Sequence, residues 1–340
     1  MGFLNFFTQE IAIDLGTANF LIEQNEKIVV EQPSIIAVDS RTNQMIAFGH
    51  QAYLMEGKTH ESIRTIRPLR GGVIADFKAA EQMIKGMLRM IPLKNRWATP
   101  SFRMAICIPS GITEVEKRAV QDSAEYSGAK ELYLIHEPMA AAIGIGLDVK
   151  GATGHMIIDI GGGTTEIAVI SLGGIVCDES LRVAGENFDE DIIDHMRTKH
   201  NLLIGRFTAE QIKVAVGAVG YDLKTPPPDF SVKGRNSFTG MPQQVQVGYQ
   251  EIAHCLEKSI SKIEEAIMRV LENIPPELSS DIYQSGIYLT GGGAMLRGLD
   301  QRIAAKTHLP VHVVDDPLRV VMKGTSIALK NSKNFSFLMK

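Results

Sequence analysis

The sequence predicts an α/β protein made of two lobes that repeat one another, each carrying a small inserted subdomain. Strand signals and helix signals alternate along the chain, which is typical of sheets covered by helices. The length of 340 residues corresponds to two or three domains, and 44% hydrophobic residues are enough for large buried cores. One strand–turn–strand pattern also occurs twice, at residues 12–22 and 158–170, which indicates an internal duplication.

The first half of the chain carries the signals of a sheet flanked by helices. Helical spacing of apolar residues predicts a helix over 78–91. Thr113 and Glu116 form a capping box that begins a second helix, ending near Tyr126. Pro138 suits the first position of a third helix, which is rich in alanine. The expected strands are 11–15, 20–23, 27–30 with an extension around 35–38, 103–108 and 132–135, and the polar stretch 41–72 indicates an insertion.

The pattern restarts after Gly151, as an internal duplication requires. Residues 186–249 then diverge, which indicates a second insertion. Over 250–273 the apolar residues form one stripe of a long helix, and such a stripe more often packs in a core than against a partner. Within the second insertion, the expected elements are helices at 189–199 and 209–219 and polar strands such as 243–247.

Each repeated hairpin has the composition of a phosphate-binding turn. An apolar strand ends in an aspartate, a glycine lies two residues later, and small or hydroxyl residues turn the chain. Glycine lets the backbone approach an anion and turn its N–H groups inward, and a strand-end carboxylate can hold Mg²⁺ through water. Two such hairpins that face one another would hold a polyphosphate from both sides. The residues expected to do so are Asp14, Gly16, Thr17, Ala18 and Asn19, then Asp159, Gly161, Gly162, Gly163 and Thr164, with Asp14 and Asp159 placing the metal.

A third glycine-rich loop and one glutamate complete the candidate site. The loop Thr290, Gly291, Gly292, Gly293 follows a short apolar strand. One such loop alone is more often a structural turn, but three in this order are specific. Glu137 ends a strand directly before the Pro138 helix, at the sheet edge where the two aspartates are expected, so its carboxylate can orient or deprotonate a water. An ordinary N-cap glutamate is the alternative interpretation.

These motifs give the chain a family resemblance. The segments DLGTAN (14–19), EPMAAAIG (137–144), DIGGGTTE (159–166) and LTGGGAMLRGLD (289–300) resemble the actin, Hsp70 and sugar-kinase superfamily of ATPases and, within it, the MreB family of bacterial actins. The resemblance runs from about residue 9 to about residue 330. It implies the actin-like ATPase fold, with two duplicated ribonuclease-H-like lobes and the nucleotide in the cleft. The implied division is a first lobe core (1–33, 73–150, 322–340), its insertion (34–72), a second lobe core (151–185, 250–321) and its insertion (186–249).

The resemblance also implies roles for single residues. Glu137 corresponds to the family's water-polarising glutamate, and Thr164 would help to place the same water. Glu210 and Lys213 are three residues apart and share a helix face, which suits a ribose and a base, although spacing alone favours an exposed ion pair. The implied adenosine pocket comprises Glu210, Gln211, Ile212, Lys213, Thr290, Gly291, Gly292 and Gly293. Phe20, His136 and Ala215 depart from the family's usual residues, which concerns nucleotide affinity more than the fold.

The implied function is that of a filament-forming ATPase beneath the cytoplasmic membrane. Such a protein helps to determine cell shape by organising cell-wall synthesis, binds ATP with Mg²⁺, and hydrolyses it slowly as it assembles; GTP also suits these motifs. Its implied partners are copies of itself and membrane proteins of the cell-elongation machinery. A sugar or acetate kinase of the same superfamily is the main alternative, followed by a chaperone ATPase. The kinases usually need a longer chain and a catalytic aspartate where this chain has Glu137.

The composition indicates which partners and which cellular location to expect for this protein. The formal charge of −4 and the scattered charged residues give no cluster of basic residues suited to binding nucleic acid. Cys107, Cys177 and Cys255 predict reduced core thiols. His195 and His200 lie in a charged, helix-like segment, where a solvated face is expected and not a metal site. No apolar run approaches the ~18 residues of a membrane span, and the N-terminus lacks the features of a signal peptide, so we expect a cytoplasmic protein.

The N-terminal segment is a candidate membrane contact of assembled filaments. It places four large apolar side chains ahead of the first strand, and a terminus that frays or packs against the first lobe is an equally open alternative. Trp97 and Phe102, in an expected loop, offer a second contact on the same lobe. The four N-terminal side chains are Phe3, Leu4, Phe6 and Phe7.

Overall fold

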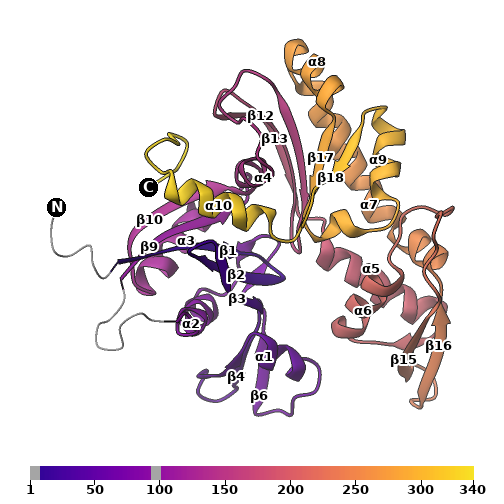
Figure 1. Cartoon of the computed structure of the whole chain (residues 1–340). Helices are drawn as coiled ribbons and strands as arrows, with labels where there is room; N and C mark the ends of the chain where they lie inside the picture. The colour runs from indigo at the N-terminus through magenta and orange to yellow at the C-terminus, as the bar shows by residue number, and fades with distance from the viewer. Residues whose placement is uncertain (1–7, 93–100) are drawn as a thin grey trace.

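Two five-stranded mixed sheets lie side by side in the computed structural model, which describes residues 8–92 and 101–340 (Figure 1). The first sheet has the order β3-β2-β1-β9-β10 and the second β13-β12-β11-β17-β18. The strands of the first are β1 (Thr8–Leu15), β2 (Asn19–Gln24), β3 (Lys27–Pro33), β9 (Ser101–Ile108) and β10 (Ala129–His136). Those of the second are β11 (His155–Ile160), β12 (Thr165–Ser171), β13 (Gly174–Leu181), β17 (Ile287–Thr290) and β18 (Val311–Val313).

The two sheets share one topology. In each, the first three strands of the lobe form an antiparallel meander, and the last two join in parallel on the other side of the first strand. Parallel strands need crossover connections, and here helices supply them. The duplication predicted from the repeated hairpin is therefore confirmed, because both the hairpin and the strand order around it recur.

Helices cover both sheets and fill the space between them. In Figure 1, α4 (Glu137–Ile145) and α10 (Val320–Lys330) lie between the lobes, and buried residues from both helices belong to one core cluster. The long helix α7 (Tyr249–Asn273) buries its apolar stripe in the core of the second lobe, as predicted. The remaining large helices are α2 (Phe77–Leu88), α3 (Glu114–Tyr126), α5 (Gly185–Lys199), α8 (Pro276–Ser285) and α9 (Leu299–Thr307).

Each lobe also carries a small three-stranded sheet. The first consists of β4 (Ile36–Asp39), β5 (Met45–Phe48) and β6 (Ile63–Ile66) with α1 (His50–Met55), and the hairpin β7 (Leu69–Arg70) and β8 (Val73–Ile74) returns to the lobe. The second consists of β14 (Leu202–Leu203), β15 (Phe230–Asn236) and β16 (Pro242–Val247) beside α6 (Arg206–Val216). The expected extension of the third strand to 35–38 is wrong, because β3 ends at Pro33 and β4 belongs to the separate sheet.

Two glycines let α4 and α10 pack with their backbones in contact. A Cβ added to Gly324 would overlap the carbonyl oxygen of Ala140 and lie 2.8 Å from the Gly144 nitrogen. A Cβ added to Gly144 would overlap the carbonyl oxygen of Val320. Neither obstacle is a flexible side chain, so the helices would have to separate. This crossing fixes α10 against the first lobe at the junction between the two lobes.

We expect Gly324→Ala to destabilise the protein by about 1–3 kcal/mol or more, because overpacking forces the backbone apart. Urea denaturation measures this, with Gly174→Ala as the matched control, since a Cβ there would have its nearest neighbour at 3.9 Å. Equal unfolding free energies for the two variants would show that the close crossing does not contribute to stability.

Among the described residues, no helix has both the length and the apolar composition needed to cross a membrane. Phe102 lies in β9, is 3% exposed and packs in the core of the first lobe, so its predicted membrane contact is wrong. Phe3, Leu4, Phe6, Phe7 and Trp97 lie outside the described residues.

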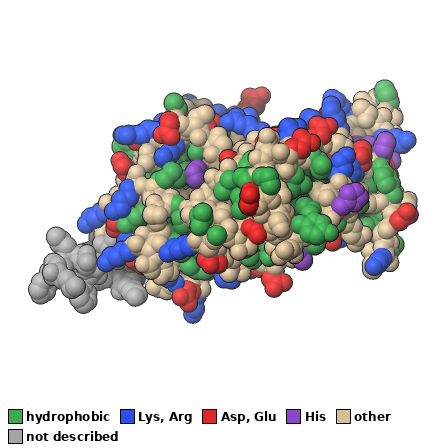
Figure 2. All heavy atoms as spheres, turned by 90° about the horizontal axis from the view of Figure 1, so that it is seen from above, with side chains coloured by type: hydrophobic (Ala, Val, Ile, Leu, Met, Phe, Trp, Pro, Cys, Tyr) green, Lys and Arg blue, Asp and Glu red, His purple; other side chains and the backbone are tan. Residues whose placement is uncertain are grey.

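Charged side chains of both signs are interspersed over the surface. Figure 2 shows the face seen from above, where lysine and arginine alternate with acidic side chains and hydrophobic side chains gather near the middle. Cys107 is buried, and Cys177 and Cys255 are half-buried free thiols, in agreement with the prediction of unpaired core cysteines.

Candidate functional site

The two glycine-rich hairpins face one another across the space between the lobes. A Cβ added to Gly162 would lie 2.7 Å from Cβ of Ala18, and one added to Gly163 would lie 2.6 Å from the Gly72 nitrogen. Only glycine therefore allows the turns to approach this closely. One pocket lies between them and is lined by Asp14, Gly16, Thr17, Ala18, Asn19, Gly72, Glu137, Asp159, Gly161, Gly162, Gly163, Thr164, Gly291 and Gly292, among others.

Three carboxyl groups meet at the base of this pocket. Burial raises the pKa of Asp14 to about 6, although the Cys107 thiol donates a hydrogen bond to its Oδ1 over 3.4 Å. Burial and then the charge of Asp14 raise the pKa of Asp159 to about 7. Burial and the neighbouring carboxylates raise the pKa of Glu137 well above its usual value. Such mutual repulsion is relieved by a bound cation, and an oxygen-only donor set is the one that Mg²⁺ prefers.

Glu137 is the first residue of α4, and the N-cap position belongs to His136, which makes no side-chain capping bond. The alternative interpretation of Glu137 as an N-cap is therefore wrong. The strand β10 ends at His136, and Pro138 follows Glu137 in the first turn, so the backbone delivers the carboxylate to the pocket at the carboxyl end of the strand.

Sequence reasoning assigned no role to Glu166, although it belongs to the quoted motif. Glu166 is fully buried and stands opposite Asp159 in the β11–β12 register. Its carboxylate accepts hydrogen bonds from Ser110 N at 3.0 Å, Ser110 Oγ at 2.6 Å and Ser180 Oγ at 2.6 Å. This network holds a negative charge beside Asp159 and Glu137. The hairpin register was the signal that could have found it, because directly opposite residues share a face.

The third loop contributes half of its predicted residues to the pocket. Gly291 has φ +81°, and a Cβ there would lie 2.6 Å from the Ile160 carbonyl carbon, so glycine is required. Gly291 and Gly292 line the pocket. Thr290 is buried and donates from Oγ1 to the Pro317 carbonyl over 3.1 Å, which fixes the segment entering α10, and Gly293 is buried as well.

A second pocket adjoins the first and shares Ala18, Asn19 and Gly162 with it. Glu210 and Lys213 of α6 line this pocket, as the adenosine prediction requires of their position. Their partners are other groups and not each other. Lys213 Nζ lies 2.7 Å from Asp189 Oδ1 and donates to the Gly185 carbonyl over 3.1 Å.

The other predicted or unusual residues lie outside both pockets. Gln211 is exposed, and Ile212 is fully buried in the core of the second lobe, so neither side chain lines the pockets. Phe20 is fully buried in the first core and Ala215 packs against the second. His136 is half-buried, and its Nδ1 lies 3.3 Å from the Pro109 carbonyl oxygen.

Tyr53 links α1 to α6 at the second pocket. It lies on α1, and its hydroxyl donates a hydrogen bond to the Glu210 carboxylate on α6. The Tyr53 and Phe207 rings pack with their centroids 5.3 Å apart, and Lys58 Nζ lies 5.7 Å from the Phe207 centroid. Nothing in the local sequence indicated this contact, because its members are far apart in the chain.

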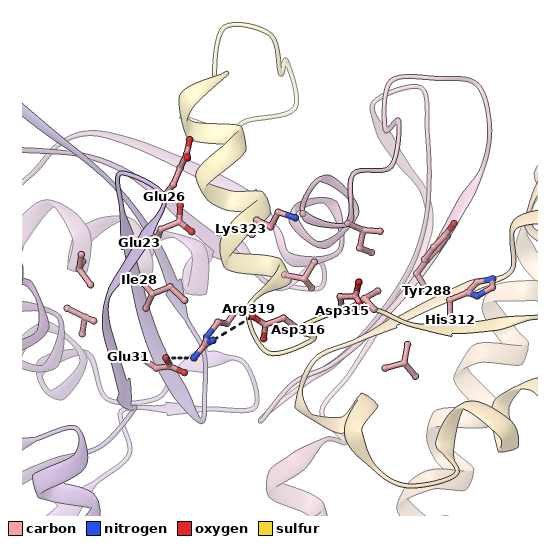
Figure 3. A pocket seen from close by; sticks show the side chains of 17 residues that line it. Glu23, Glu26, Ile28, Glu31, Tyr288, His312, Asp315, Asp316, Arg319 and Lys323 are labelled. Carbon is pink, nitrogen blue, oxygen red and sulfur yellow. Dashed lines mark hydrogen bonds and ion pairs between the residues drawn. The ribbon is translucent and has the colours of Figure 1, made fainter.

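A cavity of about 1110 Å³ lies elsewhere between the lobes. Figure 3 shows it between β3 and α10 on one side and the strands carrying Tyr288 and His312 on the other. Arg319 links Glu31 at 2.9 Å and Asp316 at 3.6 Å within it. None of the predicted site residues lines this cavity.

Two duplicated mixed sheets with facing glycine-rich turns and a cluster of carboxyl groups between them define an actin-like protein of the nucleotide-binding class. The family model described as MreB/Mbl protein matches residues 8–336. The chain belongs to the MreB/Mbl family.

Several known proteins are similar to this chain in sequence, in structure or in both. Cell shape-determining protein Mbl of Bacillus subtilis is 43% identical over 326 residues, covering 96% of this chain and 97% of that protein. Cell shape-determining protein MreB of Escherichia coli is 44% identical over 335 residues, covering 96% and 95%. The crystal structure of MreB5 of Spiroplasma citri bound to AMPPNP is similar to this chain, with a TM-score of 0.90 and 38% sequence identity. The match covers 96% of this chain and 97% of that one. The structure of MreB5 bound to ADP has a TM-score of 0.88. The actin-like fold expected from the sequence is confirmed.

Proposed function

We propose that this protein is an ATP-binding bacterial actin homologue that assembles into filaments and helps to determine cell shape. The observation that carries the proposal is the pair of facing hairpins, with half-buried Asp14 and buried Asp159 in the pocket between them. The names of the relatives support the role in cell shape, and the AMPPNP and ADP in the MreB5 structures support an adenine nucleotide. The four-part division into two lobe cores and two insertions is part of the proposal.

Different residues of this chain would bind the phosphates, hold the metal ion and position the attacking water. Backbone N–H groups of turns 16–18 and 161–163 would hold the phosphates. Asp14 and Asp159 would hold Mg²⁺ through water, and the ion, when bound, supplies the positive charge that neutralises the phosphates. Glu137 would orient and accept a proton from the attacking water, and Thr164, which lines the same pocket, would help to place that water.

The nucleoside would lie in the adjoining pocket. Glu210 offers a carboxylate to the ribose hydroxyls, and the Lys213 stem lies beside Asp189 and Gly185 on the same wall. The Tyr53 hydroxyl donates a hydrogen bond to the Glu210 carboxylate, and both side chains line this pocket. Tyr53 therefore closes the mouth of this pocket between the two insertions.

We expect Tyr53→Phe to speed the release of a fluorescent ATP analogue by roughly 2- to 10-fold, since a hydrogen bond contributes about 0.5–1.5 kcal/mol net. Stopped-flow displacement by unlabelled ATP measures this rate. Tyr283→Phe is the control, because Tyr283 is 71% exposed on α8. An unchanged or slower release from Tyr53→Phe would mean that this contact does not close the pocket.

Two experiments distinguish a filament-forming ATPase from a kinase that phosphorylates a sugar or acetate. Light scattering and negative-stain microscopy of the intact protein, with and without ATP and Mg²⁺, should show filaments that depend on nucleotide. Phosphate release should not increase when sugars or acetate are added. A phosphorylated sugar or acetyl phosphate among the products would replace this proposal with the kinase alternative.

The proposal places the filaments on the inner face of the cytoplasmic membrane. The apolar residues Phe3, Leu4, Phe6 and Phe7 would each contribute about 1–3 kcal/mol if fully buried in lipid. One copy would bind weakly, whereas a filament presents many copies at high effective concentration. Liposome co-sedimentation with ATP should therefore require both assembly and residues 2–7. If a version lacking those residues assembles and sediments with lipid equally well, the anchor lies elsewhere.

A further inference from the structure

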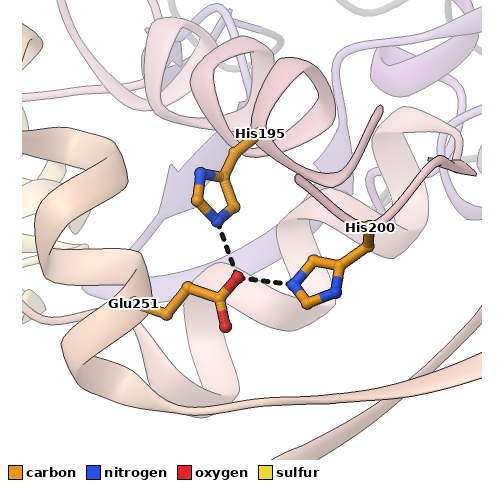
Figure 4. Close-up of side chains that lie close together, drawn as sticks. All are labelled: His195, His200 and Glu251. Atoms are coloured by element: carbon orange, nitrogen blue, oxygen red, sulfur yellow. Dashed lines mark hydrogen bonds and ion pairs between the residues drawn. The ribbon is translucent and has the colours of Figure 1, made fainter. Parts of the chain in front are cut away.

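Three potential metal ligands converge where α5 ends and α7 begins, at the border between the second insertion and the core of the second lobe. His195 Nε2 lies 2.7 Å from Glu251 Oε1, and His200 Nε2 lies 2.5 Å from the same oxygen (Figure 4). The expected solvated face for the two histidines is wrong, because their side chains are only 16% and 21% exposed. The first turn of α7 packs against the end of α5 and brings the Glu251 carboxylate between the two rings.

We propose that His195, His200 and Glu251 form a binding site for a divalent transition metal, of which Zn²⁺ is the leading candidate. One ligand atom from each residue lies within 4.8 Å of the other two. Two imidazole nitrogens and one carboxylate oxygen are a known zinc donor set, in which water completes the coordination. The partial exposure of all three side chains leaves room for that water.

The rings need only small movements to accept a metal. Ligand atoms around tetrahedral zinc lie about 3.4 Å apart, given bonds of about 2.1 Å. The two Nε2–Oε1 distances of 2.7 and 2.5 Å are therefore short of that separation by less than ~1 Å. The ring planes are inclined at 68° with centroids 6.1 Å apart, so the rings are not stacked. Figure 4 shows both Nε2 atoms directed at the same oxygen of Glu251.

The charge state of the cluster also suits a cation. Although burial opposes ionisation, the hydrogen bonds from His195 and His200 hold the pKa of Glu251 below its usual value. A metal would bind the lone pair of each Nε2, so each ring would carry its proton on Nδ1 in the metal-bound form. Asp191 and Asp194, whose charges reach the neighbouring Cys255 thiol, add negative potential around the site.

The ligand types at this site favour a different metal from the one expected at Asp14 and Asp159. Imidazole ligands favour Zn²⁺, Cu²⁺ or Ni²⁺, whereas Mg²⁺ prefers oxygen ligands alone. None of the three residues lines the two pockets between the hairpins. A bound metal would tie the end of α5 to the start of α7 and stiffen the second insertion, and it would not contact the nucleotide.

The test is a zinc titration of the intact protein by calorimetry, after treatment with EDTA and its removal, in excess Mg²⁺. We expect one Zn²⁺ per chain, and Co²⁺ substitution should give the visible absorption of a four-coordinate ion. Glu251→Gln, which keeps the shape of the side chain, and His200→Gln should each weaken zinc binding by about 10- to 100-fold or more. His254→Gln is the matched control, because His254 is an exposed histidine of α7 outside the cluster.

Two further measurements show whether a loss of zinc binding comes from misfolding or from a change at the nucleotide site. Far-ultraviolet circular dichroism and ATP binding should be unchanged in Glu251→Gln. If Glu251→Gln folds and binds zinc as tightly as the original protein, or if His254→Gln weakens binding to the same extent, the cluster is a hydrogen-bonded contact and not a metal site. Absence of zinc binding to the original protein would overturn the proposal directly.

Discussion

Replacing Glu137 with alanine should slow ATP hydrolysis by about 10²- to 10⁴-fold and leave nucleotide affinity nearly unchanged. The carboxylate lies at the start of α4 and lines the pocket between the hairpins, where it would touch the attacking water and not the bound phosphates. Phosphate release and nucleotide affinity, measured side by side, separate the two effects. Glu137→Gln should also be slow, because it retains the shape of the residue and loses the base.

The same substitution should not lower the thermal stability of the nucleotide-free protein. Burial and the neighbouring carboxylates raise the pKa of Glu137, so its charged form is disfavoured in the folded state and stability falls as the pH rises through that raised pKa. Alanine removes this repulsion. Glu125→Ala on α3, where the residue is exposed, serves as the control. An unchanged hydrolysis rate in Glu137→Ala would exclude Glu137 from the reaction.

Asparagine at Asp14 or Asp159 should weaken Mg²⁺-dependent ATP binding by about 10- to 100-fold, as loss of an outer-sphere group does at metal sites. Binding in EDTA should change far less, because the backbone N–H groups of the turns contact phosphate without the metal. The structure supports this expectation through the raised pKa values of the two buried carboxyls, about 6 and about 7, which a nearby cation would lower.

Titrations of each variant with and without EDTA provide the comparison, and Asp222→Asn, at an exposed position outside both pockets, is the control. Because Asp159 is buried and Asp14 is half-buried, a purely structural role is the competing explanation. Equal losses of affinity under both conditions would establish that role and remove the two residues from the metal site.

Local sequence patterns predicted the parts of the fold that local chemistry determines. The capping box of Thr113 and Glu116 forms at the start of α3, and the stripe of α7 is buried as its period indicated. The strand at 35–38 was placed in the wrong sheet because period and propensity do not specify a strand's partners. Helix α8 was not predicted, although Pro276 in its first turn was a usable signal.

The site was predictable where glycine and aspartate repeat, and not where distant segments meet. The hairpin residues and Glu137 line one pocket because each follows directly from a strand end. The Tyr53–Glu210 contact, the serines around Glu166 and the pairing of His195 and His200 with Glu251 depend on tertiary packing between separate elements. Phe102 was misplaced because the beginning of β9 was assigned to a loop, whereas its side chain packs inside the first lobe.

The location of the nucleotide is the central claim, and a structure of the intact protein with a non-hydrolysable ATP analogue and Mg²⁺ tests it most directly. The phosphates should lie within hydrogen-bonding distance of the backbone nitrogens of turns 16–18 and 161–163, with Glu137 facing the terminal phosphate across a water. The ribose should contact Glu210. A nucleotide found instead in the large cavity beside Arg319 and Tyr288, with the hairpins empty, would contradict the account.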